Sequence, residues 1–542
     1  MPATSVIMAP DSAPLDPPPE AIETVETPSP PPEVHDLHLL LVLEEASVPA
    51  LRKAKPLAAS LRRPSTRKLH QIFWDTADFR LGRAGLATAI QNQGRRRSQI
   101  VRPVARRPTG GDVRPQTESP VGADRPDIAR LALMPGFDPS LLREIASADL
   151  VPVFAIDLSH THWTIRWRDT ELLVTLEAGT IETARGRGRF HQLDLALQAG
   201  PAAGLYDFAL SLHGEVPLRL ATHEPAQRGY ALAAGEDWWP DRAGAVELRR
   251  SMSVRDGVLA IGRAAAADFR AETGTLETGL QPERIHQARV AIRRLRSLLT
   301  VFRDVLPPRA RMALAQDLGG LASMLGHARE WDVFLAETLE PMIKAVGDGA
   351  GFGTQRFAAA VLREEAADRA LAAIKAPGFM AISLTLAAWF DAGIWPEPPT
   401  AEMKALLASP LEAFATRLLR KRHRKLLAAV ERLKDPRPQE LHQIRIGVKK
   451  LRYTAEFMHS LFPAKPFRQY LAGLKELQQV LGTLNDADVA RKLALRLSAP
   501  NKEAGAHLAG LITGWTAAEM AAATKRLGEA WADFAETKRF WK

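Results

Sequence analysis

Residues 286–296 read HQARVAIRRLR, and residues 442–452 repeat the pattern as HQIRIGVKKLR. The two copies lie 156 residues apart without a gap, and the match continues as far as Val333 and Val489, with twelve identities in 48 aligned positions. At about 100° per residue, offsets of 0, 3, 7 and 10 fall on one face of a helix. The repeat therefore predicts two related helices, each with a stripe of basic side chains along one face.

Each predicted stripe joins one imidazole to three cations and contains no acid. Its members are His286, Arg289, Arg293 and Arg296 in the first copy, and His442, Arg445, Lys449 and Arg452 in the second. Solvated helix faces gain stability by mixing charge signs, whereas like charges along one face repel. Arginine forks pair with phosphate oxygens, and lysine acts as a point charge. Two such stripes facing each other therefore favour binding of a linear chain of phosphates.

Further basic residues surround the stripes. They are Arg294 and Lys450 beside the stripes, Arg420, Lys421 and Arg424 on the helix before the second copy, and Arg263 and Arg270 on the helix before the first. We expect the first five to extend the anion-binding surface, with part of the charge on the preceding helix simply solvated. Apolar residues between the cations, such as Ile292 and Val448, must pack against neighbouring helices.

Length and composition limit the classes of protein that fit. The chain has 542 residues, enough for two to four domains, with 46% hydrophobic and 25% charged residues. It has no cysteine, which excludes disulfides, Cys-ligated zinc and thiol catalysis. The net charge of +10 favours polyanionic partners. No apolar run approaches the roughly 20 residues that span a bilayer, so we expect a cytoplasmic protein without a membrane partner.

The apolar pattern changes along the chain. Residues 1–32 are proline-rich and acidic and are predicted to be disordered. Residues 33–235 hold short apolar bursts typical of strands, with a few helices and a loop at about 102–127. Residues 245–538 have helical spacing throughout, in two related parts at about 245–395 and 400–538. The predicted fold is multidomain α+β: an antiparallel barrel-like or tunnel-like domain, then an all-α domain of two four-helix bundles.

The helical half resembles the CHAD family (conserved histidine α-helical domain). The matching stretches are IHQARVAIRRLRSLLTVF, LGHAREWDVF, LHQIRIGVKKLRYTAEF and LQQVLGTLNDADVA, in family order. The resemblance implies two bundles related by a pseudo-two-fold axis around a basic pore or groove that binds inorganic polyphosphate, and association with polyphosphate granules. It also implies that the eight stripe residues line the polyphosphate path. Asp332, Asp486 and Asp488 are expected to orient cations or cap helices; magnesium binding is the alternative.

Residues 33–232 resemble the CYTH family, the triphosphate tunnel fold, most clearly in IFWDTADFRLGRAGLA. The positions at which the family carries carboxylates and cations are occupied here by Asp36, His38, Leu40, Ala89, Gln91, Gln192, Asp194, Ala196 and Pro225. The charged residues that remain in this sequence are Arg80, Arg83, Arg102, Glu177 and Asp194. Metal-assisted phosphoryl transfer needs carboxylates to hold the metal and cations to hold the phosphates. Because most of both sets are lost, we expect this domain to be catalytically inactive.

Three functions remain open from the sequence. The first is a binding protein for polyphosphate, with granule proteins as further partners and no cofactor. The second is a metal-dependent triphosphatase or polyphosphatase, which would need Mg²⁺ or Mn²⁺. The third is a general polyanion or nucleic-acid binder. Single-strand binders usually add aromatic stacking platforms, and Tyr453 is the one aromatic candidate near the stripes. We therefore favour the first and regard nucleic acid as a poor match.

Overall fold

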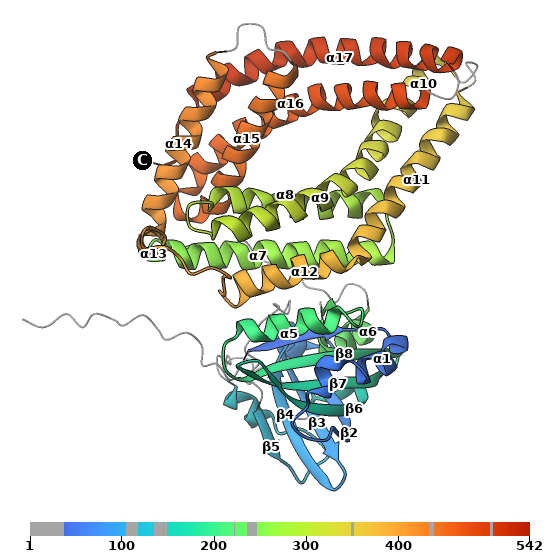
Figure 1. Ribbon diagram of the computed structural model, residues 1–542, viewed down its shortest axis with the longest axis vertical. Helices are drawn as coiled ribbons and strands as arrows, with labels where there is room; N and C mark the ends of the chain where they lie inside the picture. Colours follow the sequence, from blue (N-terminus) through green and yellow to red (C-terminus); the bar gives the residue numbers. More distant parts are fainter. Residues whose placement is uncertain are drawn as a thin grey trace, which may run out of the picture. The chain divides into compact units, whose positions relative to one another are not determined.

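The computed structural model describes residues 37–104, 117–134, 145, 149–221, 223–235, 246–347, 352–432, 438–498 and 502–541. The predicted disordered segment 1–32, Asp36 and residues 105–116 of the predicted loop lie outside these ranges. Every described strand lies before residue 221, and the residues beyond 253 are helical (Figure 1). The predicted order, an antiparallel sheet domain followed by an all-α domain, is confirmed.

The N-terminal domain is built on one nine-stranded antiparallel sheet. Its strands are β1 (His38–Val42), β2 (Ser65–Asp75), β3 (Leu86–Gln93), β4 (Arg96–Pro103), β5 (Thr117–Pro120), β6 (Val151–Trp167), β7 (Thr170–Thr183), β8 (Gly186–Ala199) and β9 (Arg219–Leu220). They follow the order β5-β4-β3-β2-β6-β7-β8-β1-β9. Among the described residues no hydrogen-bonded pairing closes β9 onto β5. The predicted loop at 102–127 is wrong in part, because 117–120 form β5.

Short helices connect or cover the strands. They are α1 (Val48–Arg52), α2 (Lys55–Ala58), α3 (Arg80–Arg83), α5 (Ala203–His213) and α6 (Pro225–Ala234), with 3-10 turns at Glu45–Ser47 and Ile128–Leu133. The buried Asp75 carboxylate organises the connection from β2 to β3. It accepts hydrogen bonds from the backbone N–H groups of Leu81 (2.9 Å) and Gly82 (2.8 Å). Asp75, the first aspartate of the stretch IFWDTADFRLGRAGLA, thus holds the turn between these two strands.

The C-terminal domain contains two matching sets of helices. The first comprises α7 (Val254–Gly274), α8 (Pro282–Val301), α9 (Pro308–Val333), the π-helical segment η7 (Phe334–Leu339), α10 (Glu340–Val346), α11 (Gly353–Lys375), α12 (Pro377–Leu386) and the π-helical segment η9 (Ala387–Asp391). The second comprises α13 (Ala401–Ala408), α14 (Leu411–Val430), α15 (Pro438–Met458), α16 (Ala464–Ser498) and α17 (Lys502–Glu536). Moved by 156 residues, α7 and α8 coincide with α14 and α15, so the sequence repeat is a structural repeat.

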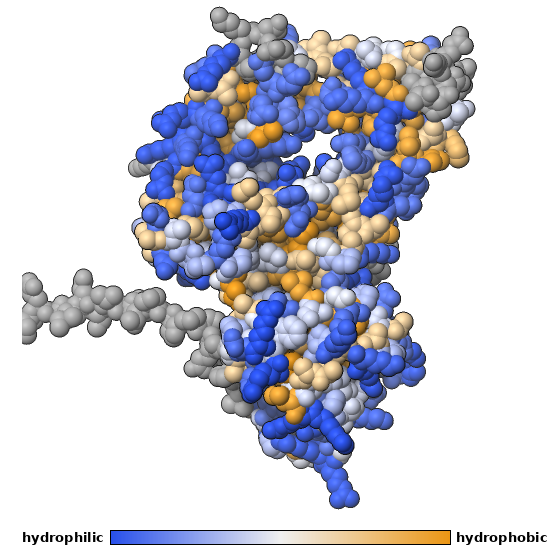
Figure 2. Space-filling view, in the orientation of Figure 1, coloured by the Kyte–Doolittle hydropathy of each residue, from blue (hydrophilic) through white to orange (hydrophobic). Residues whose placement is uncertain are grey.

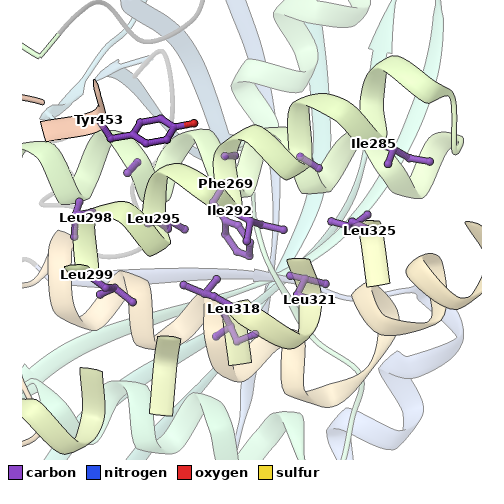
Figure 3. Close-up of a cluster of buried hydrophobic side chains, with 14 of the residues drawn as sticks. Phe269, Ile285, Ile292, Leu295, Leu298, Leu299, Leu318, Leu321, Leu325 and Tyr453 are labelled. Atoms are coloured by element: carbon purple, nitrogen blue, oxygen red, sulfur yellow. The ribbon is translucent and has the colours of Figure 1, made fainter. Parts of the chain in front are cut away.

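Apolar residues between the predicted cations form the core beneath the stripes. Ile292 and Leu295 of α8 are fully buried and lie with Leu318 and Leu321 of α9 in one cluster (Figure 3). In the second repeat Val448 belongs to an equivalent cluster that includes residues of α16 and α17. Pro282 and Pro308 stand in the first turns of α8 and α9, because the fixed φ of proline suits that position.

The helical spacing of the sequence predicts separate helices at 308–325 and 328–345, and at 467–481 and 486–496; both predicted breaks are wrong. Residues 308–346 continue from α9 through η7 into α10, and α16 runs through Asn485-Asp486, where a helix start was predicted. Leu484 and Ala487 are buried on either side of that pair, so packing keeps the helix continuous.

Among the described residues no single helix has the length and apolarity to cross a membrane. Helix α11 and the segment Pro377–Asp391 reach that length and apolarity only together, and the two are bent by 58° relative to each other.

Candidate functional site

Four cations from the two repeats converge between α8 and α15. Arg289 and Arg293 come from α8, and Arg445 and Lys449 come from α15; we call these four residues the inner cluster. Their charges interact across the two helices: Arg293 acts on Arg445 and Lys449, and Arg445 acts on Arg289. Among the described residues none of the four forms an ion pair with an acid. The two predicted stripes therefore meet at their central positions.

Burial and mutual repulsion destabilise the charged forms of the inner cluster. Burial, followed by the charges of Arg445 and Arg293, lowers the pKa of Lys449 from 10.5 to about 7. The pKa values of Arg289 and Arg445 are lowered by the same two causes, burial first. Asp486 of α16 opposes the shift in Arg445 and Lys449 without pairing with them. An anion placed here would relieve both costs.

Hydrogen bonds fix two of these guanidinium groups. Arg293 donates from Nε to the hydroxyl of the buried Tyr453, and its guanidinium lies 5.8 Å from the centre of that ring. Arg289 donates from Nη1 to the carbonyl of Ala322 on α9, at 3.3 Å. By contrast, Nε of Arg445 is buried and has no hydrogen-bond partner within the described part of the chain. The cluster is held in place but retains unused donors.

The outer members of the stripes are placed differently. His286 is half-buried, and its pKa is lowered by burial and then by the charge of Arg329 on α9. Arg296 and His442 are exposed. Arg452 pairs with Glu456 on its own helix at 3.3 Å and lies 4.9 Å from the centre of the Tyr453 ring. Of these four residues, His286 feels the charges of Arg289 and Arg293, and Arg452 shares Tyr453 with Arg293. Arg329 is a neighbour that the sequence did not single out.

The cations predicted to flank the stripes have other neighbours. Arg294 pairs with Asp268 of α7 at 3.0 Å. The pKa of Lys450 is lowered by burial and by Arg422 and Lys425 of α14, away from the inner cluster. Arg263 and Arg270, expected to add cations, instead bind the η9 segment. None of these four positions joins the stripes.

The three aspartates of the repeat are engaged by cations or lie near them. Asp332 pairs with Arg363 of α11 at 3.0 Å, and Asp488 pairs with Lys492 at 2.6 Å. Asp486 lies near Arg445 and Lys449. Within the described ranges no group of three His, Cys, Asp or Glu residues is arranged to hold a metal ion. The pairs of Asp332 with Arg363 and of Asp488 with Lys492 fit the expected role of orienting cations.

Arg420, Lys421 and Arg424 lie on a different surface from the inner cluster. Together with Arg250 and Arg417 they line a cavity of about 960 Å³ on the side of α14; we call these five cations the α14 surface. The opposite side of α14 carries Arg422, which donates to the carbonyls of Thr300 (3.2 Å) and Lys450 (3.3 Å). Figure 2 shows hydrophilic residues over α14 and α15 and along an opening between α9 and α16.

The N-terminal sheet holds a second, polar pocket of about 350 Å³. Alternate residues of neighbouring strands line it, because side chains alternate between the two faces of a sheet. The lining includes Arg67, Gln71, Gln91, Arg96, Arg102, Glu118, His160, His162 and Glu177. Of the retained family positions, Arg102 and Glu177 face this pocket, whereas Arg80 pairs with Asp78 at 3.0 Å outside it. Arg83 and Asp194 do not line the pocket.

Carboxylates in and near this pocket are already bound by other side chains. Glu177 contacts His160 Nε2 at 3.1 Å and accepts a hydrogen bond from Gln192. Burial opposes ionisation of Glu177, but these two partners outweigh it and lower the pKa. Asp194 contacts His38 Nδ1 at 3.0 Å. His38 and Gln192 stand where the family has carboxylates, and here they contact the two acids that remain, Asp194 and Glu177.

Gly326, which lies against Arg289, was not singled out from the sequence although the repeat contains it. A methyl group on Gly326 of α9 would lie 2.6 Å from Nη1 of Arg289, so glycine leaves room for that guanidinium. The equivalent Gly482 on α16 has nothing within 4 Å of such a group. The glycine recurs at the same offset as the stripes, and that recurrence was the available signal.

Comparisons with known proteins agree with the two-part organisation. The family model of the CHAD domain matches residues 260–495. The CHAD domain from the plant Ricinus communis is 30% identical, over 56% of this chain and 98% of that chain, with a TM-score of 0.47. An inorganic triphosphatase of Haemophilus influenzae is 22% identical over 180 residues, 32% of this chain and 50% of that protein. The chain thus spans about half the length of this curated relative.

A solved structure also matches the N-terminal region. It is a Hippeastrum protein described as an adenylyl cyclase with a dominant triphosphatase activity, 16% identical over 36% of this chain and 94% of that chain, with a TM-score of 0.27.

Proposed function

Because the chain belongs to the CHAD family, we propose that it binds inorganic polyphosphate at the inner cluster. One observation supports this proposal above the others: Arg289, Arg293, Arg445 and Lys449 converge from two repeats without an acidic partner in the described residues. Desolvated like charges cost free energy unless an opposite charge offsets them. A chain with one negative charge per phosphate supplies that charge along its length.

The relatives support a function related to polyphosphate or triphosphate. Nucleic acid fits the inner cluster less well than polyphosphate. Tyr453, the aromatic residue at the cluster, is buried and carries guanidinium groups over its ring, so it offers no face for base stacking. We include attachment to polyphosphate granules in the proposal, because a granule presents the same ligand.

We also propose that the N-terminal domain does not hydrolyse triphosphate. Its remaining acids, Glu177 and Asp194, are held by His160 and His38. Both oxygens of each carboxylate contact a neighbouring side chain, so a metal ion would have to displace these contacts to bind there. Arg67, Arg96 and Arg102 would still attract an anion to the pocket, so binding without turnover fits these residues.

The salt dependence of binding tests the main proposal. Each cation that neutralises a phosphate contributes close to one unit to the slope of log affinity against log salt. We expect Arg289→Ala with Arg445→Ala to lower that slope by about two units for long-chain polyphosphate. Lys404→Ala with Lys525→Ala, two exposed cations elsewhere, should leave the slope unchanged. An unchanged slope in the first variant would show that the inner cluster does not touch the ligand.

A further inference from the structure

The α14 surface carries a strong excess of positive charge. Arg417, Arg420, Lys421 and Arg424 follow the spacing i, i+3, i+4 and i+7, which places them within about 100° of one helix face. All four are exposed, and Arg250 adds a fifth cation from the segment before α7. The single acid in the cavity, Glu412, lies 3.5 Å from Arg250. Among the described residues Arg420, Lys421 and Arg424 have no acidic partner.

The α14 surface and the inner cluster are separated by α14 itself. Arg422 marks the side of α14 that faces α8 and α15, through its bonds to Thr300 and Lys450. The α14 surface points away from that side, so at least one helix diameter, about 10 Å, lies between it and the inner cluster on α15. A short phosphate chain can engage one of the two surfaces, and a long chain can engage both.

The chemistry of the α14 surface suits an inorganic polyanion. The aromatic side chains near it are engaged by other residues. Phe414 lies beneath the guanidinium of Arg417 at 5.6 Å, Phe540 is buried, and the half-buried Phe462 packs against Phe540. This arrangement is a poor platform for stacking the bases of a nucleic acid. The row of cations follows the helix over about 10 Å, which matches an extended linear ligand.

We propose that the α14 surface is a second contact for the same polyphosphate chain and gives the protein a preference for long chains. This inference rests on the proposed function of the inner cluster. Exposed cations are screened by salt and bind weakly alone. Once the inner cluster holds one part of a chain, the remainder is presented to the α14 surface at a high effective concentration. The second contact therefore raises affinity for long chains without a comparable effect on short ones.

A length series tests the proposal in the full-length protein. We compare Arg420→Gln/Lys421→Gln/Arg424→Gln with a control of equal charge change, Lys404→Gln/Lys475→Gln/Lys525→Gln, whose positions are all exposed. Binding of tripolyphosphate and of long-chain polyphosphate is measured at one salt concentration. We expect the α14 variant to lose at least about tenfold in affinity for long chains and to stay within about twofold for tripolyphosphate. The control should match the wild type with both ligands.

Other outcomes would overturn the assignment in distinct ways. Unchanged long-chain affinity in the α14 variant would remove the α14 surface from the binding path. Equal losses for both ligands would make it the primary site instead. If polyglutamate of equal charge displaces long chains as well as polyphosphate does, the surface serves acidic proteins. Failure of the wild type to bind either phosphate ligand would instead refute the proposed function. Circular dichroism and thermal unfolding of each variant confirm that it is folded.

Discussion

Lys449 is the residue whose charge state is most sensitive to its surroundings. Its pKa is lowered to about 7 by burial and by Arg445 and Arg293, so the free protein holds this proton only in part at neutral pH. Because a bound anion favours the ammonium form, binding should take up a proton. We expect affinity for tripolyphosphate to fall as pH rises from about 6 to about 8.

Lys449→Arg supplies the matched comparison, because a guanidinium stays charged over this range. Titration calorimetry in buffers of different ionisation enthalpy measures the protons taken up. Protons taken up by the ligand and by His286 contribute equally to the uptake measured for the wild type and for Lys449→Arg. Identical pH profiles and proton uptake in the wild type and the variant would show that Lys449 does not titrate near neutrality.

The same shift has a consequence for stability. The pKa of Lys449 is below its ordinary 10.5 in the folded protein, so the unfolded chain binds more protons between about pH 7 and 10.5. Stability from this group therefore rises with pH across that window. Relative to Lys449→Met, the wild type should gain free energy of unfolding between pH 7 and 9, as measured with urea. A constant difference between the two proteins would contradict the shift.

Gly326 and Gly482 form a natural pair of test and control. Alanine is favoured over glycine inside a helix by about 1 kcal/mol, so Gly482→Ala should stabilise α16 and leave binding unchanged. In Gly326→Ala the new methyl group would displace the Arg289 guanidinium from Ala322. We expect a loss of about threefold to tenfold in polyphosphate affinity, the size of one net hydrogen bond. Equal affinity in the two variants would show that the position of Arg289 is unimportant.

At the scale of elements, the π-helical segment η9 explains the placement of two arginines of α7. Arg263 of α7 donates to the carbonyl of Phe390 at 2.9 Å, and Arg270 contacts the carboxylate of Asp391 at 3.2 Å. In a π-helical segment the backbone hydrogen bonds join residues five apart instead of four apart, and such segments occur frequently at functional sites. The buried Arg270–Asp391 pair therefore links α7 to the end of α12.

Removing one charge of the Arg270–Asp391 pair should lower the free energy of unfolding. Arg270→Met leaves the Asp391 carboxylate buried without its partner, and we expect a loss of about 3–5 kcal/mol in the free energy of unfolding. The double variant Arg270→Met/Asp391→Leu removes both charges and should regain most of that loss. Denaturant titration measures both. If the double variant is no more stable than the single one, the pair is not the source of the effect.

The elements that the sequence predicted well are those with a strong apolar period. The repeat located α8 and α15, and helical geometry then brought Arg289, Arg293, Arg445 and Lys449 onto facing sides. Strands β3 and β4 carry no simple apolar alternation, because polar residues such as Thr88 and Gln91 are buried on both of their faces. Buried Gln91 and Gln99 instead pair with Gln71 and Thr88. Such networks depend on which strands are neighbours, which the local pattern does not contain.

Helix continuity was the other element-scale error. Asn485-Asp486 suits a helix start, since both side chains accept hydrogen bonds from free backbone N–H groups. In α16 the flanking Leu484 lies in a small cluster with Ala523 of α17, and this packing outweighs the local preference. The same limit applies to Arg420, Lys421 and Arg424. The sequence shows how many cations α14 carries. Which of them point toward α15 and which point away is known only from how the two helices pack.

At the scale of the whole molecule, positive charge is divided among three places: the inner cluster, the α14 surface and the pocket of the N-terminal sheet. The described residues hold no acidic partner for the inner cluster or for Arg420, Lys421 and Arg424 of the α14 surface, whereas Arg250 of that surface pairs with Glu412. The third mixes Arg67, Arg96 and Arg102 with Glu118 and Glu177. An enzyme of this kind needs acids free to hold a metal beside cations that hold the phosphates. The N-terminal pocket has the cations, but Glu177 is held by His160 and Gln192, and Glu118 accepts a hydrogen bond from Ser98.

Phosphate release by the full-length protein tests this division. With Mg²⁺ or Mn²⁺ present, we expect no release of orthophosphate from tripolyphosphate above the rate without protein. Asp194→Ala and Glu177→Gln should give the same result, because His38 and His160 already engage those acids in the wild type. Metal-dependent release that either substitution abolished would show that these histidines yield to a metal ion. The N-terminal domain would then be an active triphosphatase, and the helical domain would serve to supply its substrate.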